Sequence, residues 1–173
     1  MPNIGKPAPD FALEGVLHGE FKNFKLTEQR GKWVVLFFYP LDFTFICPTE
    51  ITGFSTRIEE FKKLNAMVFG ASTDSKHSHK AWLAGSLGDI NYPLLADQRH
   101  EVSRAYGVYL EDDGVATRGT FIIDPDGNLR YALYHDNSIG RNVDETLRVL
   151  AALQTGELCQ LGWKPGEKTL GKA

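Results

Sequence analysis

The feature that most constrains the fold is a strand, a helix and a second strand that follow one another in the first half of the chain. Residues 33–39 are a β-branched and aromatic run without polar alternation, which is typical of a strand covered on both faces. From Pro48 to Leu64 apolar residues recur at helical spacing, and residues 67–72 have the pattern of a second buried strand. We therefore expect a right-handed crossover between parallel strands, with Cys47 where the helix begins.

The segments on either side complete an α/β domain. Two hairpins are expected at residues 11–26 and 120–134, and one short strand at 93–95. Three further helices are expected at residues 80–84, 98–106 and 143–153. This order of elements predicts a thioredoxin-like fold, in which helices flank a central mixed sheet and extra elements extend both ends. We expect a single domain over residues 1–173, with a polar, mobile tail from about residue 155.

Composition excludes several classes of protein. The chain has 173 residues, of which 42% are apolar, so it is long enough to bury one core. Its formal charge of -3 provides no basic surface for nucleic acid or for an anionic membrane. The first ten residues have no apolar stretch of the kind found in secretion signals, so a cytoplasmic protein is expected.

The two cysteines, Cys47 and Cys159, need separate explanations. They are too few for a disulfide-stapled scaffold, and they lack the paired spacing of structural zinc ligands. In a reducing compartment each thiol is inert, catalytic or a redox switch. At the start of a helix, Cys47 faces unpaired backbone N–H groups and the positive end of the helix dipole, which favour a thiolate.

Three residues are candidates to assist such a thiolate. Thr44 lies three positions before Cys47 and offers a hydroxyl, although it is equally suited to capping the loop. Arg118 precedes a predicted strand and offers a permanent charge, although an isolated arginine is more often solvated. Pro40 has no N–H group and shields a pocket from water, or simply ends the strand before it.

Residues 38–50, Phe-Tyr-Pro-Leu-Asp-Phe-Thr-Phe-Ile-Cys-Pro-Thr-Glu, resemble the active-site segment of the typical two-cysteine peroxiredoxins. This family includes the peroxidase component of bacterial alkyl hydroperoxide reductase. The resemblance extends over nearly the whole chain, and its further segments are residues 5–9, 118–124, 140–147 and 162–166.

The resemblance implies a thiol peroxidase that reduces hydrogen peroxide and organic hydroperoxides, with Cys47 as the peroxidatic cysteine. Thr44, Arg118 and the Cys47 N–H would bind the peroxide oxygens, and Pro40 would shield the pocket.

Two more charged residues match the family's supporting positions. Glu50 and Arg141 would hold Arg118 through a carboxylate–guanidinium network. The alternative is a surface ion pair of little energy.

The resemblance makes Cys159 the resolving cysteine, which would join Cys47 of the partner subunit in a disulfide. The flanking residues Leu158, Gln160 and Leu161 depart from the family's common Val-Cys-Pro-Ala. A thioredoxin-type or flavin-linked disulfide reductase would then reduce the disulfide. No cofactor is implied. Homodimers assembling into a decameric ring are implied, with Phe43 and Phe45 as interface residues.

Two other functions remain open. A thioredoxin-like disulfide reductase requires a second cysteine three positions after Cys47, where the chain has Glu50. A ring of this kind also suits a holdase chaperone or a structural assembly. His77 and His79 lie between lysines without matched ligands, so we expect them to be solvated rather than metal-bound.

Overall fold

The computed structural model describes residues 1–172, and the chain divides into two compact units, Met1–Arg141 and Asn142–Ala173. Within residues 1–172, the first unit contains every strand, and the second contains one helix and the segment that follows it. The single domain and the mobile tail remain predictions.

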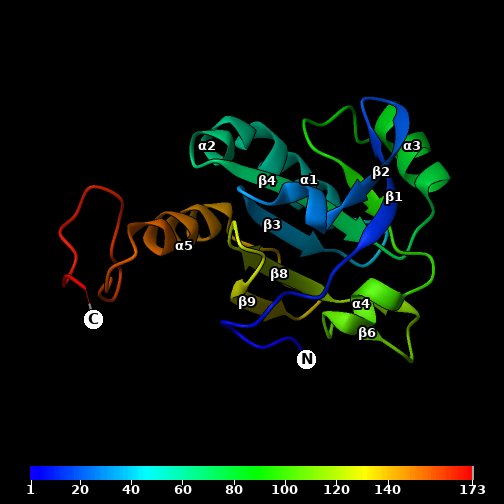
Figure 1. The fold of residues 1–173 in the computed structure, drawn as a ribbon. Coiled ribbons are helices and arrows are strands. Elements are labelled where there is room, and N and C mark those ends of the chain that lie inside the picture. The colour runs from blue at the N-terminus through cyan, green and yellow to red at the C-terminus, as the bar shows by residue number, and fades with distance from the viewer. Residues whose placement is uncertain (173) are drawn as a thin grey trace. The chain divides into compact units, whose positions relative to one another are not determined.

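One mixed sheet forms the centre of the first unit (Figure 1). Its strand order is β2-β1-β5-β4-β3-β8-β9. The strands are β1 (Ala12–Leu17), β2 (Glu20–Lys25), β3 (Trp33–Phe38), β4 (Ala66–Ser72), β5 (Leu94–Ala96), β8 (Arg118–Ile123) and β9 (Leu129–His135). Strand β3 is parallel to β4 and antiparallel to β8, so the predicted crossover and the mixed sheet are confirmed.

Strand β3 lies in the interior of the sheet, between β4 and β8, and its side chains are buried on both faces. Phe37 stacks on Phe54 with ring centroids 4.5 Å apart, on the face that α1 covers. On the other face, Phe38 meets Phe121 edge to face at 6.0 Å. Burial of this kind stabilises a fold by roughly 2 kcal/mol for each large apolar side chain.

The helices differ from the prediction in three places, and one of these is the helix expected over 80–84, which begins four residues earlier, at Lys76. The first unit has α1 (Cys47–Thr56), α2 (Ile58–Lys63), α3 (Lys76–Ala84), α4 (Glu101–Ala105) and a 3-10 turn at Leu26–Gln29. The prediction of one continuous helix from Pro48 to Leu64 was wrong, because the chain turns at Arg57 (φ -102°, ψ 9°). Near that break the Thr56 hydroxyl donates to the Gly53 carbonyl, a bond that competes with the helical pattern.

The helix expected over 98–106 is shorter than predicted. His100 adopts a left-handed conformation (φ 59°), and the buried Asp97 carboxylate accepts the N–H groups of Val102 and Ser103. The carboxylate therefore caps the helix, and α4 begins at Glu101. A small hairpin of β6 (Tyr109–Leu110) and β7 (Val115–Ala116) follows, and no sequence pattern predicted it.

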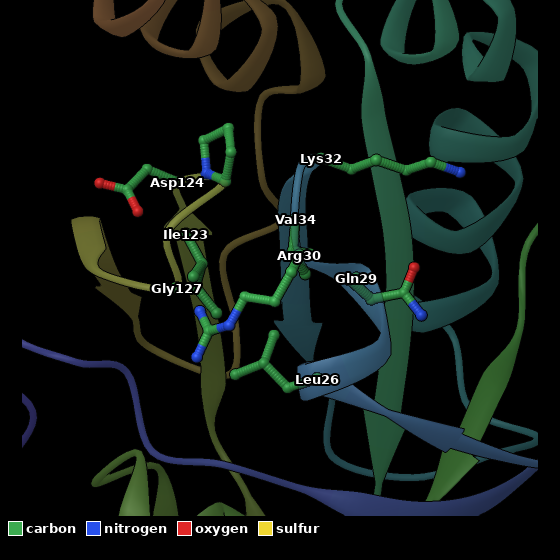
Figure 2. Close-up of a pocket in the computed structure, with 9 residues that line it drawn as sticks. Leu26, Gln29, Arg30, Lys32, Val34, Ile123, Asp124 and Gly127 are labelled. Atoms are coloured by element: carbon green, nitrogen blue, oxygen red, sulfur yellow. The ribbon is translucent and has the colours of Figure 1, made fainter.

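The turn between β8 and β9 lies against a neighbouring arginine. The Gly127 N–H donates to the Asp124 carbonyl at 2.9 Å, and Gly127 has a φ of +84°. Figure 2 shows the Arg30 side chain reaching from the segment before β3 toward Gly127, in a pocket that Leu26 also lines. A side chain at position 127 would displace that guanidinium.

The second unit begins with the predicted helix, α5 (Val143–Thr155). The Asn142 side chain accepts the Glu145 N–H, and Gly156 ends the helix in the left-handed region. Beyond it, the Leu170 N–H donates to the Leu158 carbonyl and the Leu158 N–H donates to the Gly171 carbonyl, both at 2.8 Å. The loop between them buries Trp163, whose carbonyl accepts from Arg148 of α5 at 3.1 Å.

Candidate active site

Cys47 is the first residue of α1 and Pro48 the second, so the helix begins one residue earlier than the sequence predicts. Its side chain is only 1% exposed. The sulfur lies at the N-terminal end of the helix, where backbone N–H groups and the helix dipole stabilise negative charge. The loop of residues 40–46 connects this position to the end of β3.

Arg118 supplies the positive charge beside the sulfur. It is the first residue of β8, is 3% exposed, and its Nη1 lies 3.4 Å from Cys47 Sγ. The expectation that an isolated arginine is solvated does not apply here. The planar guanidinium therefore presents positive charge and N–H donors to Cys47.

Glu50 joins Arg118 to a second arginine. Its Oε2 accepts from Arg118 Nη1 at 2.6 Å and from Arg141 Nη2 at 2.9 Å, and the Glu50 side chain is 3% exposed. One turn of α1 after Cys47, this carboxylate therefore holds two guanidinium groups. The alternative of an exposed surface pair is wrong, since all three side chains are buried.

Arg141 is fixed from several directions. Its Nη1 donates to the carbonyls of Phe38 and Gly119, both at 2.8 Å, and its guanidinium lies over the Phe37 ring at 4.9 Å. Burial lowers the pKa of Arg141, and the neighbouring Glu50 carboxylate counters this effect. Arg141 thus hydrogen-bonds to residues of β3, β8 and α1, the last of which carries Cys47.

Thr44 and Pro40 lie in the loop before Cys47. The Thr44 hydroxyl donates to the Leu41 carbonyl at 3.0 Å, which leaves its oxygen lone pairs as acceptors. Pro40 is half-buried and follows β3 by two residues. The structure places both in the segment that leads to Cys47, and among the described residues no hydrogen bond joins the Thr44 hydroxyl to the sulfur.

The expectation that His79 is solvated was wrong, because this side chain is completely buried. His79 Nδ1 lies 2.7 Å from Asp42 Oδ2, and its Nε2 lies 3.0 Å from the Leu95 carbonyl. Tyr39 donates to Asp42 Oδ1 at 2.8 Å, and burial raises the pKa of that tyrosine well above its usual value. The cluster anchors the loop of residues 40–46 to α3 and β5. His77, in contrast, is exposed.

Cys159 is half-buried and lies just beyond the C-terminal end of α5. Its sulfur is 3.6 Å from Thr155 Oγ1, 3.9 Å from the Ala152 carbonyl and 3.8 Å from the Glu157 carbonyl. Oxygen acceptors therefore surround this thiol, whereas a helix N-terminus and an arginine face Cys47. Both cysteines are free.

Residues 1–172 lack two other features that would point to a different function. Within this range, no three or more His, Cys, Asp or Glu side chains gather to hold a metal ion. In the same part of the chain, every helix is too short or too polar to cross a membrane.

Comparison with known proteins agrees with this geometry. The family model described as AhpC/TSA family matches residues 4–132. Peroxiredoxin prdx-2 of Caenorhabditis elegans is 54% identical and covers 96% of this chain and 88% of its own length.

Solved structures give the same result. The reduced 2-Cys peroxiredoxin of Plasmodium vivax superposes with a TM-score of 0.90 at 40% identity, covering 95% of this chain and 91% of that one. AhpC of Mycobacterium bovis gives a TM-score of 0.85 at 41% identity, covering 95% of this chain and 100% of that one. With a buried cysteine at a helix start beside an arginine, the chain belongs to the AhpC/TSA family and is a typical two-cysteine peroxiredoxin, a thiol-dependent peroxidase that acts on peroxides.

Proposed function

We propose that Cys47 is the peroxidatic thiol and Cys159 the resolving thiol of this peroxidase. The observation that carries the first assignment is the 3.4 Å contact between Arg118 Nη1 and Cys47 Sγ at the start of α1. An arginine and a helix N-terminus together favour the thiolate, which is the nucleophilic form. Among the cysteines, only Cys47 has this environment.

In the first step the Cys47 thiolate attacks the terminal oxygen of the peroxide, and the O–O bond breaks. Sulfur is oxidised to sulfenic acid, while the leaving oxygen takes a proton and departs as water or alcohol. Arg118, the Cys47 N–H and the Thr44 hydroxyl bind the two oxygens and stabilise the charge that moves onto the leaving oxygen. Pro40 shields the pocket, and Glu50 with Arg141 holds Arg118.

In the second step the Cys159 thiol of the partner subunit attacks the sulfenic sulfur. A disulfide forms and water leaves. A thioredoxin-type or flavin-linked reductase then restores both thiols by exchange and supplies the two electrons.

We extend the proposal to assembly and location. The protein works as a homodimer that assembles into a decameric ring, in the cytoplasm. Phe43 and Phe45 are 58% and 93% exposed, which makes them available to such an interface.

The disulfide reductase and the holdase are not favoured. The place of a second active-site cysteine is taken by Glu50, and its carboxylate is committed to two arginines. The relatives are peroxiredoxins.

The cysteine assignments are tested on a non-reducing gel after one equivalent of hydrogen peroxide. Wild-type protein should form a covalent dimer, and peptide mapping should find Cys47 joined to Cys159. Cys47→Ser and Cys159→Ser should each lose that dimer. A dimer that persists in either variant would refute the assignment of that cysteine.

A further inference from the structure

Arg118 is held on the side away from Cys47 by a single main-chain oxygen. Its Nε and Nη2 donate to the Asn137 carbonyl at 3.1 and 3.0 Å, while Nη1 faces Cys47 Sγ and Glu50. Nε and Nη2 form one edge of the planar guanidinium, so a carbonyl that accepts from both fixes the orientation of the plane. The direction of Nη1 toward the sulfur depends on where that carbonyl lies.

The carbonyl lies in a turn closed by side chains. Arg118 and His135 are register partners in β8 and β9, and the turn of residues 136–139 follows directly. Asp136 Oδ1 accepts from the Ser138 N–H at 2.8 Å and from its hydroxyl at 2.6 Å, and the Ile139 N–H donates to the Asp136 carbonyl at 3.1 Å. An exposed Asp136 thus sets the conformation of a half-buried Asn137.

The turn is also attached to the residue before Arg118. The Thr117 hydroxyl lies 2.8 Å from the His135 carbonyl and 3.1 Å from Asn137 Oδ1. Arg141 lies three residues after Ser138, and its backbone N–H donates to Glu50 Oε1 at 2.9 Å. One short segment therefore positions both Arg118 and its carboxylate partner.

A neutral carbonyl suits this position better than a second carboxylate. Glu50 already offsets one of the two buried guanidinium charges. Another full negative charge against Arg118 would weaken the attraction of the guanidinium for a thiolate, because the two anions would compete for it. The Asn137 oxygen orients the arginine and leaves its charge available to the sulfur.

We propose that the turn of residues 136–139 is a positioning element for Arg118, and that Asp136 acts on peroxide reduction through the Asn137 carbonyl. This inference rests on the proposed role of Cys47. Over residues 1–172, the turn residues form no hydrogen bond to the sulfur and act through Arg118, so they are positioning residues rather than catalytic ones.

The test is a cycle of four proteins, namely wild type, Asp136→Ala, Arg118→Ala and the double variant. The readout is the rate of hydrogen peroxide reduction by Cys47 in single-turnover stopped flow. Misplacing a catalytic group slows an enzyme strongly, so Asp136→Ala should lose about tenfold relative to wild type. In the Arg118→Ala background the same substitution should lose less than about twofold, because the arginine it positions is gone.

Two control variants keep the result interpretable. Asp136→Asn keeps an oxygen acceptor for Ser138 and should retain the rate within about twofold. Asp113→Ala removes the same charge from another exposed position and should also retain it.

A full rate in Asp136→Ala, or an undiminished loss in the Arg118→Ala background, would overturn the inference. Failure of the proposed function gives a different pattern, since Cys47→Ser would then reduce peroxide as fast as wild type.

Discussion

At the scale of single residues, the site depends on one carboxylate shared by two guanidinium groups. Glu50, Arg118 and Arg141 are buried, and each of the two ion-pair distances is below 3 Å. Attraction within such a group is offset by the cost of desolvating its members. Removing the single negative charge leaves two buried cations without compensation.

Glu50→Gln should therefore destabilise the protein by about 3–5 kcal/mol, the usual cost of breaking a buried ion pair. Urea denaturation followed by circular dichroism measures the unfolding free energy. Glu28→Gln is the matched control, because its partner Lys25 and the Glu28 side chain are both more than half exposed. It should change stability by less than about 0.5 kcal/mol. A Glu50→Gln loss no larger than the control would contradict the network.

The raised pKa of Asp74 predicts that the stability of the fold depends on pH. Burial raises its pKa above the ordinary value, and the Asp42 N–H, which donates at 2.7 Å, offsets this only in part. Between the ordinary and the raised pKa the folded state binds more protons than the unfolded state, so this group lowers stability as pH rises through that window. Asp74→Asn removes the effect and keeps an oxygen acceptor.

The unfolding free energy of Asp74→Asn minus that of wild type should be larger at about pH 7 than at about pH 3, because only wild type loses stability as its Asp74 ionises. Urea denaturation at both pH values measures it. A difference that is constant, or that shifts toward wild type, would count against the raised pKa.

At the scale of elements, the sequence predicts most of what determines the fold. The apolar run of β3 and the helical spacing after Pro48 locate the crossover, and α1 begins at Cys47, one residue before the predicted start at Pro48. The break at Arg57 was missed, because apolar spacing continues across it.

The site was less predictable. Glu50, Arg118 and Arg141 are far apart in sequence, so their grouping came from the resemblance alone. The Asn137 contact was missed because its acceptor is a main-chain oxygen, which every residue has. His79 was misjudged because its partner Asp42 lies 37 positions away, on a loop. An aspartate in an otherwise apolar and aromatic segment was the available signal.

The β8–β9 turn gives a prediction at this scale. Gly127→Ala should cost more stability than Gly19→Ala, because both replace a glycine with a φ above +70° but only Gly127 lies against Arg30. Positive φ alone costs an alanine about 1 kcal/mol. Thermal denaturation of the two variants measures the difference. Equal losses would show that Arg30 moves away freely.

At the scale of the whole molecule, the two thiols lie in different compact units and in opposite surroundings. Cys47 begins a helix beside an arginine, and Cys159 follows a helix C-terminus among oxygen acceptors. These different surroundings suit the two proposed roles, in which Cys47 attacks peroxide and Cys159 attacks the oxidised sulfur.

Cys159→Ser should accordingly consume one peroxide per chain rapidly and then stop, since its sulfenic acid has no resolving thiol. Steady-state turnover with a reductase such as thioredoxin should fall at least about a hundredfold, while the first turnover stays near the wild-type rate. Undiminished cycling would reject the resolving role.

The most direct test of the account is peroxide consumption by Cys47→Ser beside wild type, at equal concentration and with the same dithiol reductant. The account predicts rapid consumption by wild type and none above the buffer rate for Cys47→Ser, with the fold intact by circular dichroism. Consumption by Cys47→Ser at the wild-type rate would contradict it.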